Sequence, residues 1–254
     1  MKVNLPKLRA LLQPLKAESF EKKHLVYSGD PKIDELIHSD PFAFLIGVIS
    51  DQMIPSERAW RVPALLKERL GDLKIEQIAQ MKIKELEEVM RIYPSLHRFP
   101  HIMARNFIMA ARFIIEKYGG DVSKMWNEIN LASEIQRRLL EIPGISQKKS
   151  SMMTKMLVRD WGLKVNDLHE INLPFDIHIR RVLLRLGLAE DDTIPDIQAA
   201  GRQLHAEYPA DYDDAIWLVG RRFCHPEDPD HTNCPLGKVC QKLNKNAGYA
   251  EEGK

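Results

Sequence analysis

The sequence has few cysteines, no long apolar run and almost no net charge. Three cysteines among 254 residues, an odd number, argue against a simple framework of disulfide bonds. No segment approaches the roughly 18 apolar residues that span a bilayer, and no charged stretch followed by an apolar one opens the chain. We therefore expect a monomeric intracellular protein without membrane contact, in the cytoplasm or nucleoid, or in the nucleus of a eukaryote.

The charge balance gives no general sign of nucleic-acid binding, since 37 Lys and Arg stand against 36 Asp and Glu. Local clustering must therefore support any such hypothesis. Residues 134 to 159 contain two acidic side chains and six basic ones, which are Arg137, Arg138, Lys148, Lys149, Lys155 and Arg159. The sequence HPEDPD at 225 to 230 carries three acids, so we expect this loop to repel phosphate.

Helical periodicity runs through most of the chain. Apolar residues recur at intervals of three and four in the segments 45 to 53, 102 to 118 and 179 to 188, and no sustained alternation of period two is present. Pro41 and Pro195 stand where a helix would begin, which suits a residue that lacks an amide hydrogen. The pattern predicts an all-α protein, with residues 162 to 174 as the best candidate for a long connection between two halves.

A short turn at Pro143 and Gly144 separates two apolar-periodic helices within RRLLEIPGISQKKSSMMTKML. Glycine permits the backbone conformation of a tight turn, and the first amides of the following helix lack partners within the helix. These amides can bind a phosphate, assisted by the helix dipole. The pattern is that of a helix-hairpin-helix, although an ordinary corner between packed helices would have the same sequence features.

Three motifs in order, LIGVISDQMIPSERAW, IPGISQK and FDIHIRRV, resemble the helix-hairpin-helix (HhH-GPD) DNA glycosylases, particularly the endonuclease III branch. The similarity extends from about residue 39 to Cys240. It implies an all-α, two-lobed fold. One lobe, from 41 to 160, would be a six-helix barrel carrying the hairpin, and both ends of the chain, 1 to 40 and 161 to 254, would form a second lobe with a metal loop.

The resemblance also implies the site residues. Lys148 would attack the C1′ atom of a sugar, Asp176 would support it, and Gln52 would fill the gap left by an extruded base. Contacts with DNA would include Gly144, Ser146, Gln147 and Lys149. The chemistry is consistent with these roles, since a carboxylate stabilises positive charge on the sugar and a neutral amine captures the carbon as a Schiff base.

Two alternatives stay open for these residues. The pKa of a free lysine is about 10.4. A position at the start of a helix beside another lysine lowers this pKa. Lys149 satisfies this condition as well as Lys148 does and is the rival nucleophile. Asp176 could be the N-cap of the helix that follows it, and this role is compatible with catalysis.

Two features depart from the family pattern. Ser146 stands in place of the usual second glycine of the hairpin, which allows a different local conformation or a hydroxyl contact with phosphate. The separation of Asp176 from Lys148, 176 − 148 = 28 residues, exceeds the usual spacing by about ten. Residues 162 to 174 would hold the extra length, either lining the base pocket or lying on the surface.

All three cysteines lie near the end of the chain, in the pattern Cys224-x6-His231-x2-Cys234-x5-Cys240. The resemblance implies a 4Fe-4S cluster at this spacing, with His231 in place of one cysteine. Imidazole does bind iron in some iron-sulfur centres. Three cysteines and one histidine are equally a tetrahedral zinc set, and a loop without metal is the third possibility.

The implied function is base excision repair of duplex DNA that contains a damaged or mismatched base. The enzyme would be a bifunctional DNA glycosylase and AP lyase, with oxidised pyrimidines as the default substrate, acting on a base flipped out of the stack. The alternatives are a monofunctional glycosylase for mismatched uracil, thymine or adenine, which uses water as nucleophile, and a non-catalytic protein that binds damaged DNA. The identity of the excised base cannot be read from the sequence.

Overall fold

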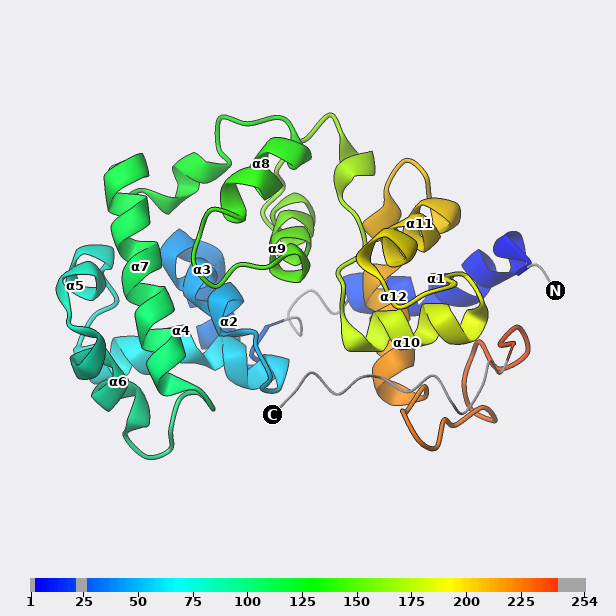
Figure 1. The fold of residues 1–254 in the computed structure, drawn as a ribbon, viewed down its shortest axis with the longest axis horizontal. Helices are drawn as coiled ribbons and strands as arrows, with labels where there is room; N and C mark the ends of the chain where they lie inside the picture. Colours follow the sequence, from blue (N-terminus) through cyan, green and yellow to red (C-terminus); the bar gives the residue numbers. More distant parts are fainter. Residues whose placement is uncertain (1–2, 22–26, 242–254) are drawn as a thin grey trace. The chain divides into compact units, whose positions relative to one another are not determined.

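The computed structural model describes residues 3 to 21 and 27 to 241. It divides into two compact units: unit 1 comprises Met1–Glu21 and Leu168–Lys254, and unit 2 comprises Lys22–Asp167. Every regular element in the described ranges is a helix, which confirms the predicted all-α class (Figure 1). No helix of the described chain is long and apolar enough to cross a membrane.

Unit 2 is built around α3, a helix that is apolar except for its last residue, Ser50. Its α-helices are α2 (Pro31–Ser39), α3 (Pro41–Ser50), α4 (Ser56–Leu70), α5 (Ile75–Gln80), α6 (Ile83–Arg91), α7 (Pro100–Tyr118), α8 (Ala132–Leu139) and α9 (Gln147–Arg159). Every residue of α3 from Phe42 to Ser50 is buried, which is expected of a helix that is apolar on all sides. Helices α2, α4, α7 and α9 pack around it.

Local signals explain where α3 begins and how closely it packs. The Asp40 carboxylate accepts a hydrogen bond from the Phe42 amide at 2.8 Å, and Pro41 occupies the first turn, where no amide donor is needed. A Cβ on Gly47 would lie 2.4 Å from the Trp60 ring. The missing side chain therefore lets the indole of α4 rest directly on the α3 backbone.

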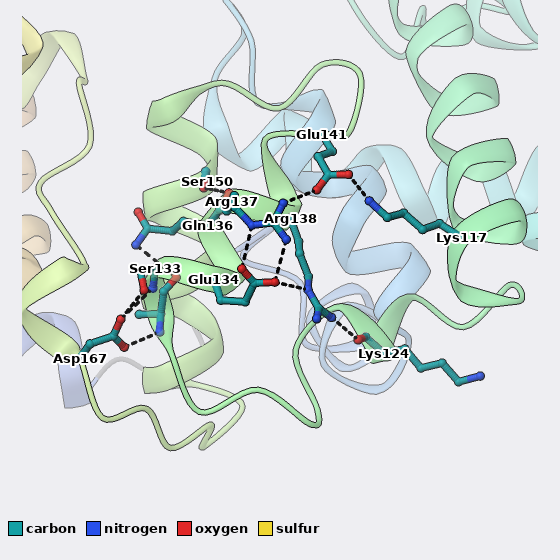
Figure 2. A network of polar contacts seen from close by, with 11 residues as sticks. Lys117, Lys124, Ser133, Glu134, Gln136, Arg137, Arg138, Glu141, Ser150 and Asp167 are labelled. Atoms are coloured by element: carbon teal, nitrogen blue, oxygen red, sulfur yellow. Dashed lines mark hydrogen bonds and ion pairs between the residues drawn. The ribbon is translucent and has the colours of Figure 1, made fainter.

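The start of the connection after α9 folds back onto unit 2. Leu163 and Val165 pack against its core, and Asp167 caps the first turn of α8. The Asp167 carboxylate accepts hydrogen bonds from the amides of Ala132 and Ser133 and from the Ser133 hydroxyl (Figure 2). This part of the predicted 162 to 174 connection supports the helix that leads into the hairpin.

Unit 1 joins the N-terminal helix to the C-terminal third of the chain. It contains α1 (Leu5–Glu21), the 3-10 turns η3 (Leu168–Glu170) and η4 (Pro209–Tyr212), and the helices α10 (Ile177–Leu186), α11 (Ile194–Leu204) and α12 (Asp213–Arg222). Helix α1 packs against α11 and α12, and α10 packs against α12. Leu8 and Leu12 of α1 are completely buried in the core of this unit.

The unit boundaries differ from the expected ranges of 41 to 160 and 1 to 40 with 161 to 254. Unit 2 extends to residues 22 and 167. Its N-terminal extension includes α2, which packs against α3 and α4. Its C-terminal extension is the segment held by Asp167. Residues 1 to 2, 22 to 26 and 242 to 254 of the expected ranges lie outside the described residues.

Candidate functional site

The turn between α8 and α9 requires glycine at position 144. Gly144 has φ = 90°, a backbone conformation that side chains rarely adopt. A Cβ there would lie 2.7 Å from Nδ2 of the buried Asn106. The Ile145 amide donates to the Ile142 carbonyl at 3.1 Å and closes the turn. The predicted helix-hairpin-helix is therefore present, and Asn106 is a supporting residue that sequence analysis did not identify.

Ser146 replaces the second glycine of the family pattern without strain. Its φ of −98° lies in the extended region that any residue adopts, and it stands as the N-cap of α9. Gln147 follows as the first residue of α9, and its Nε2 atom donates to the Ser151 hydroxyl at 3.1 Å. The departure at Ser146 therefore leaves the hairpin geometry intact.

Lys148 forms an ion pair with Asp51. The Lys148 Nζ atom lies 3.1 Å from Oδ2 of Asp51, and the two side chains are 31% and 12% exposed. Asp51 is the C-cap of α3, so the pair joins the end of α3 to the first turn of α9. Sequence analysis did not identify Asp51, although this residue directly precedes the candidate Gln52.

Lys149 points into the protein. It is 4% exposed, and its Nζ atom donates to the carbonyl oxygens of Ile49 and Gly144 at 2.8 and 2.9 Å. Burial lowers the pKa of Lys149 to about 8, and the Lys148 charge acts in the same direction against the opposing charge of Asp51. Of the two rival lysines, Lys148 thus has the accessible amine, whereas a DNA contact at Lys149 would have to use its backbone.

His97 binds the neighbouring carbonyl at the end of α3. Its Nε2 atom lies 3.1 Å from the Ser50 oxygen, and its Nδ1 atom accepts a hydrogen bond from the Phe99 amide at 2.9 Å. Both contacts are satisfied by a neutral imidazole with the proton on Nε2. Burial lowers the pKa of His97 and favours that neutral form.

Gln52 lies at the start of the loop between α3 and α4. Its amide donates to the Ser50 carbonyl at 2.7 Å, and its side chain is half-buried. The next residue, Met53, has φ = 53° and is 63% exposed. The loop is therefore tightly turned and presents an apolar side chain beside the residue expected to fill the gap in the DNA.

The basic segment from 134 to 159 is neutralised by carboxylates. Arg137 pairs with Glu134 at 2.7 Å and with Glu141 at 2.9 Å, and Arg138 pairs with Glu134 at 2.8 Å (Figure 2). Hydrogen bonds from Arg137 and then Arg138 lower the pKa of Glu134 to about 2.

The remaining basic residues of this segment are also engaged or buried. Arg159 pairs with Asp160 at 2.6 Å, Lys155 is buried, and the two hairpin lysines have the contacts described above. The predicted concentration of basic charge therefore does not form an open cationic surface.

In unit 1, Asp176 caps α10. Its carboxylate is 7% exposed and accepts a hydrogen bond from the His178 amide at 2.8 Å, as the N-cap interpretation predicted. Burial lowers the pKa of His178 despite the nearby negative charge of Asp176. Because Lys148 belongs to unit 2, its catalytic pairing with Asp176 stays a prediction.

The arginines of α10 bind protein groups. Arg180 pairs with Asp192, and the buried Arg181 donates to the carbonyls of Cys224 and Gly220. Arg185 donates to the carbonyls of His225 and Pro226, both at 2.6 Å. Arg181 and Arg185 thus hold the C-terminal loop onto α10.

The three cysteines and His231 line one small cavity beside α10 and α12. The Arg185 Nη1 atom lies 3.3 Å from Cys224 Sγ, where it would stabilise a thiolate. Burial raises the pKa of Cys234, and the proximity of Cys224 and Cys240 raises it further. Three thiols that would repel one another as thiolates fit a metal in their chemistry.

Within the described residues, however, no three His, Cys, Asp or Glu side chains are arranged to hold a metal ion. The ligand set of Cys224, His231, Cys234 and Cys240 therefore stays a prediction. So does the choice between an iron-sulfur cluster and zinc.

The all-helical units, the glycine turn and the lysine at the first turn of α9 define a helix-hairpin-helix protein. A family model described as HhH-GPD superfamily base excision DNA repair protein matches residues 46–206. The chain belongs to this superfamily.

Known proteins resemble the chain over most of its length. Endonuclease III of Bacillus subtilis (strain 168) is 23% identical over 213 residues, which cover 83% of this chain and 85% of that protein. Endonuclease III of Thermotoga maritima is 24% identical over 204 residues, covering 80% and 84%. The predicted resemblance to the endonuclease III branch is thus confirmed.

Solved structures share the fold. A trapped endonuclease III–DNA covalent intermediate has a TM-score of 0.68 at 20% identity, covering 95% of this chain and 97% of that one. A thermostable thymine-DNA glycosylase has a TM-score of 0.64 at 15% identity, covering 93% and 96%. The predicted helix-hairpin-helix glycosylase fold is confirmed by these likenesses.

Proposed function

We propose that the protein is a bifunctional DNA glycosylase that removes a damaged base from duplex DNA and then cleaves the strand as an AP lyase. The observation that carries the proposal is the partly exposed Lys148 amine in the first turn of α9, directly after the glycine turn. Membership of the base excision repair superfamily supports the substrate class. Oxidised pyrimidines are the default bases by resemblance.

The amides of the first turn of α9 would hold a phosphate, because the positive end of the helix dipole lies there. Such a contact positions the DNA without reading its sequence. The target nucleotide must leave the stack before the amine can reach its sugar. Gln52, in the loop after α3, is the proposed side chain that occupies the vacated space.

Lys148 would attack C1′ of the everted nucleotide, and the electron pair of the glycosidic bond would leave with the base. Asp176 would stabilise the positive charge that develops on the sugar. As the N-cap of α10 its carboxylate has a fixed orientation. The resulting Schiff base would permit β-elimination and a strand break.

Cys224, Cys234, Cys240 and His231 are the proposed ligands of a 4Fe-4S cluster, with zinc as the alternative. A bound metal would hold the C-terminal loop in its folded form, because ligand binding and local folding are coupled. The contacts of Arg181 with Cys224 and of Arg185 with His225 already attach this loop to α10. No step of the proposed reaction passes through the metal.

A monofunctional glycosylase is the second candidate, and the Lys148–Asp51 ion pair favours it. An opposite charge stabilises the ammonium form, which cannot act as a nucleophile. Water would then attack the sugar, and the strand would break only after alkali.

The two candidates differ in a panel of duplexes that each contain one lesion. The protein is incubated with each duplex, and strand breaks are measured with and without alkali. Cleavage without alkali, together with a covalent complex trapped by borohydride, is expected for the lyase. Lys148→Ala should abolish trapping, whereas Lys164→Ala, which removes an exposed lysine of the same unit, should not. Trapping that survives Lys148→Ala would reject the assignment.

A further inference from the structure

The carboxylate of Asp51 lies against the amine of Lys148. The Lys148 Nζ and Asp51 Oδ2 atoms lie 3.1 Å apart, within reach of a direct proton transfer. Asp51 is mostly buried, and it follows directly on the fully buried helix α3. Its backbone therefore continues directly from the core of unit 2.

Three further hydrogen bonds hold the backbone beside these residues. Lys149 donates to the carbonyl of Ile49 in α3 and to that of Gly144 in the hairpin turn. His97 holds the Ser50 carbonyl. Lys149 therefore joins the first turn of α9 to the last turn of α3, and His97 holds the carbonyl directly before Asp51.

Charged and titratable groups of unit 2 lie beside the pair. From α9 the Lys149 amine interacts with both Asp51 and Lys148. His97 lies in the segment before α7 and carries no charge in its hydrogen-bonded form. The charge of Arg58 in α4 contributes to lowering the pKa of that histidine. The positive charge of Lys149 therefore lies beside both members of the pair.

We propose that Asp51 is the proton acceptor that converts the Lys148 ammonium into the nucleophilic amine. The proposal rests on the assignment of Lys148 as nucleophile. Transfer of one proton from Nζ to Oδ2 turns an ion pair into a neutral amine and a neutral acid. Net charge is conserved, and a neutral pair costs less than two charges when DNA excludes water from the site.

At an abasic site the remaining steps conserve atoms and charge. The freed electron pair of Nζ forms a bond to the C1′ carbonyl carbon, and the carbonyl π electrons move to its oxygen. That oxygen takes the proton held by Asp51, which becomes a carboxylate again. A second proton moves from nitrogen to the hydroxyl, water leaves, and a protonated Schiff base remains. The nitrogen loses two protons in total, and both leave in the water molecule.

The test is the rate of borohydride trapping on abasic duplex DNA in single turnovers, measured from neutral to alkaline pH for the whole protein. Asp51→Asn keeps the shape and can still hydrogen-bond, but it cannot accept a proton. We expect it to slow trapping at neutral pH by about tenfold to a hundredfold. The deficit should narrow at high pH, where the amine is already neutral. Asp51→Glu should recover much of the rate, and Glu116→Gln, at an exposed carboxylate of α7, should match wild type.

The possible outcomes are distinct. Equal or faster trapping by Asp51→Asn at neutral pH would show that the ion pair only restrains the amine, and would overturn the proposal. A deficit of the same size at every pH would indicate a structural role and would also overturn it. Absence of trapping in the wild-type protein would reject Lys148 as nucleophile, and the proposal with it. A deficit that depends on pH, with recovery in Asp51→Glu, supports the proposal.

Discussion

The Nζ atom of Lys149 lies 2.8 Å from the carbonyl oxygen of Ile49, so a side chain of the hairpin caps the end of the central helix α3. The same amine donates to the Gly144 carbonyl at 2.9 Å. One buried amine thus joins the hairpin turn to the core of unit 2. Its protonation should therefore influence the stability of this unit.

The pH dependence of unfolding should reveal Lys149. Burial lowers its pKa from 10.5 to about 8. Between these values the unfolded chain holds a proton that the folded protein has lost, so the free energy of unfolding rises with pH through this window. The free-energy cost of burying the charged amine is present in full below pH 8 and is absent above pH 10.5. Its upper bound is about 3 kcal/mol.

The measurement compares wild type with Lys149→Met in urea denaturation at several pH values. The other titrating groups are shared, so the difference between the proteins isolates the amine. We expect the stability of wild type relative to Lys149→Met to increase across the alkaline window. Curves that remain parallel would contradict the assigned burial.

Gly144→Ala should destabilise the hairpin by about 2 kcal/mol, because a positive φ and a close contact act together. The matched control is Gly71→Ala at the end of α4, where φ is 79° but nothing lies within 4 Å of an added Cβ. That change should cost only about 1 kcal/mol. Thermal unfolding gives both values, and equal losses would show that Asn106 moves aside without cost.

Asp167→Ala should loosen the first turn of α8, since it removes the acceptor of three hydrogen bonds (Figure 2). The expected loss is about 2 kcal/mol, and Ser133→Ala should cost less. Amide exchange at Ala132 and Ser133 should accelerate in the first variant. Unchanged exchange would place the support of α8 elsewhere.

Low pH should remove the stabilisation that the Asp167 carboxylate provides. Burial raises the pKa of Asp167, but the hydrogen bonds from Ser133 and Ala132 outweigh burial, and the net pKa lies below its usual value. A carboxyl group whose pKa is lowered in the folded state stabilises the fold when the pH is above the usual carboxyl pKa. That contribution is lost as the pH falls through the lowered pKa of the folded state. The stability gap between wild type and Asp167→Ala should therefore shrink in acid. A gap that is independent of pH would exclude the charged interaction.

Metal binding by the C-terminal loop can be tested by changing one ligand. An imidazole must be neutral to bind metal, so retention should weaken in acid sooner than in a site of four cysteines. His231→Cys should shift the loss of metal to lower pH, and Cys234→Ser should reduce binding at every pH. Metal and sulfide analysis distinguishes a cluster from zinc, and identical acid profiles for His231→Cys and wild type would remove His231 from the ligand set.

The elements that depend on local sequence could be predicted. Helical periodicity gave the all-α class, and the glycine after Pro143 gave the hairpin, because a positive φ at this turn has a specific residue preference. Asp176 could be assigned as an N-cap because its acceptor role depends on the residues directly after it. The family motifs then supplied Lys148.

The relations between distant residues could not be predicted. The Lys148–Asp51 pair joins positions 148 − 51 = 97 residues apart, and nothing local links them. The count of basic residues near the hairpin overestimated the exposed charge for a different reason. Glu134 lies three and four residues before Arg137 and Arg138, a spacing at which helical side chains meet. That neutralisation was visible in the sequence.

Charge compensation beside the hairpin bears on how the protein would associate with a duplex. Cations that are already paired displace few condensed counterions from the phosphate backbone, and affinity then falls only gently as ionic strength rises. A duplex gripped mainly through the amides of α9 would therefore stay bound at salt concentrations that release proteins dependent on exposed lysines and arginines.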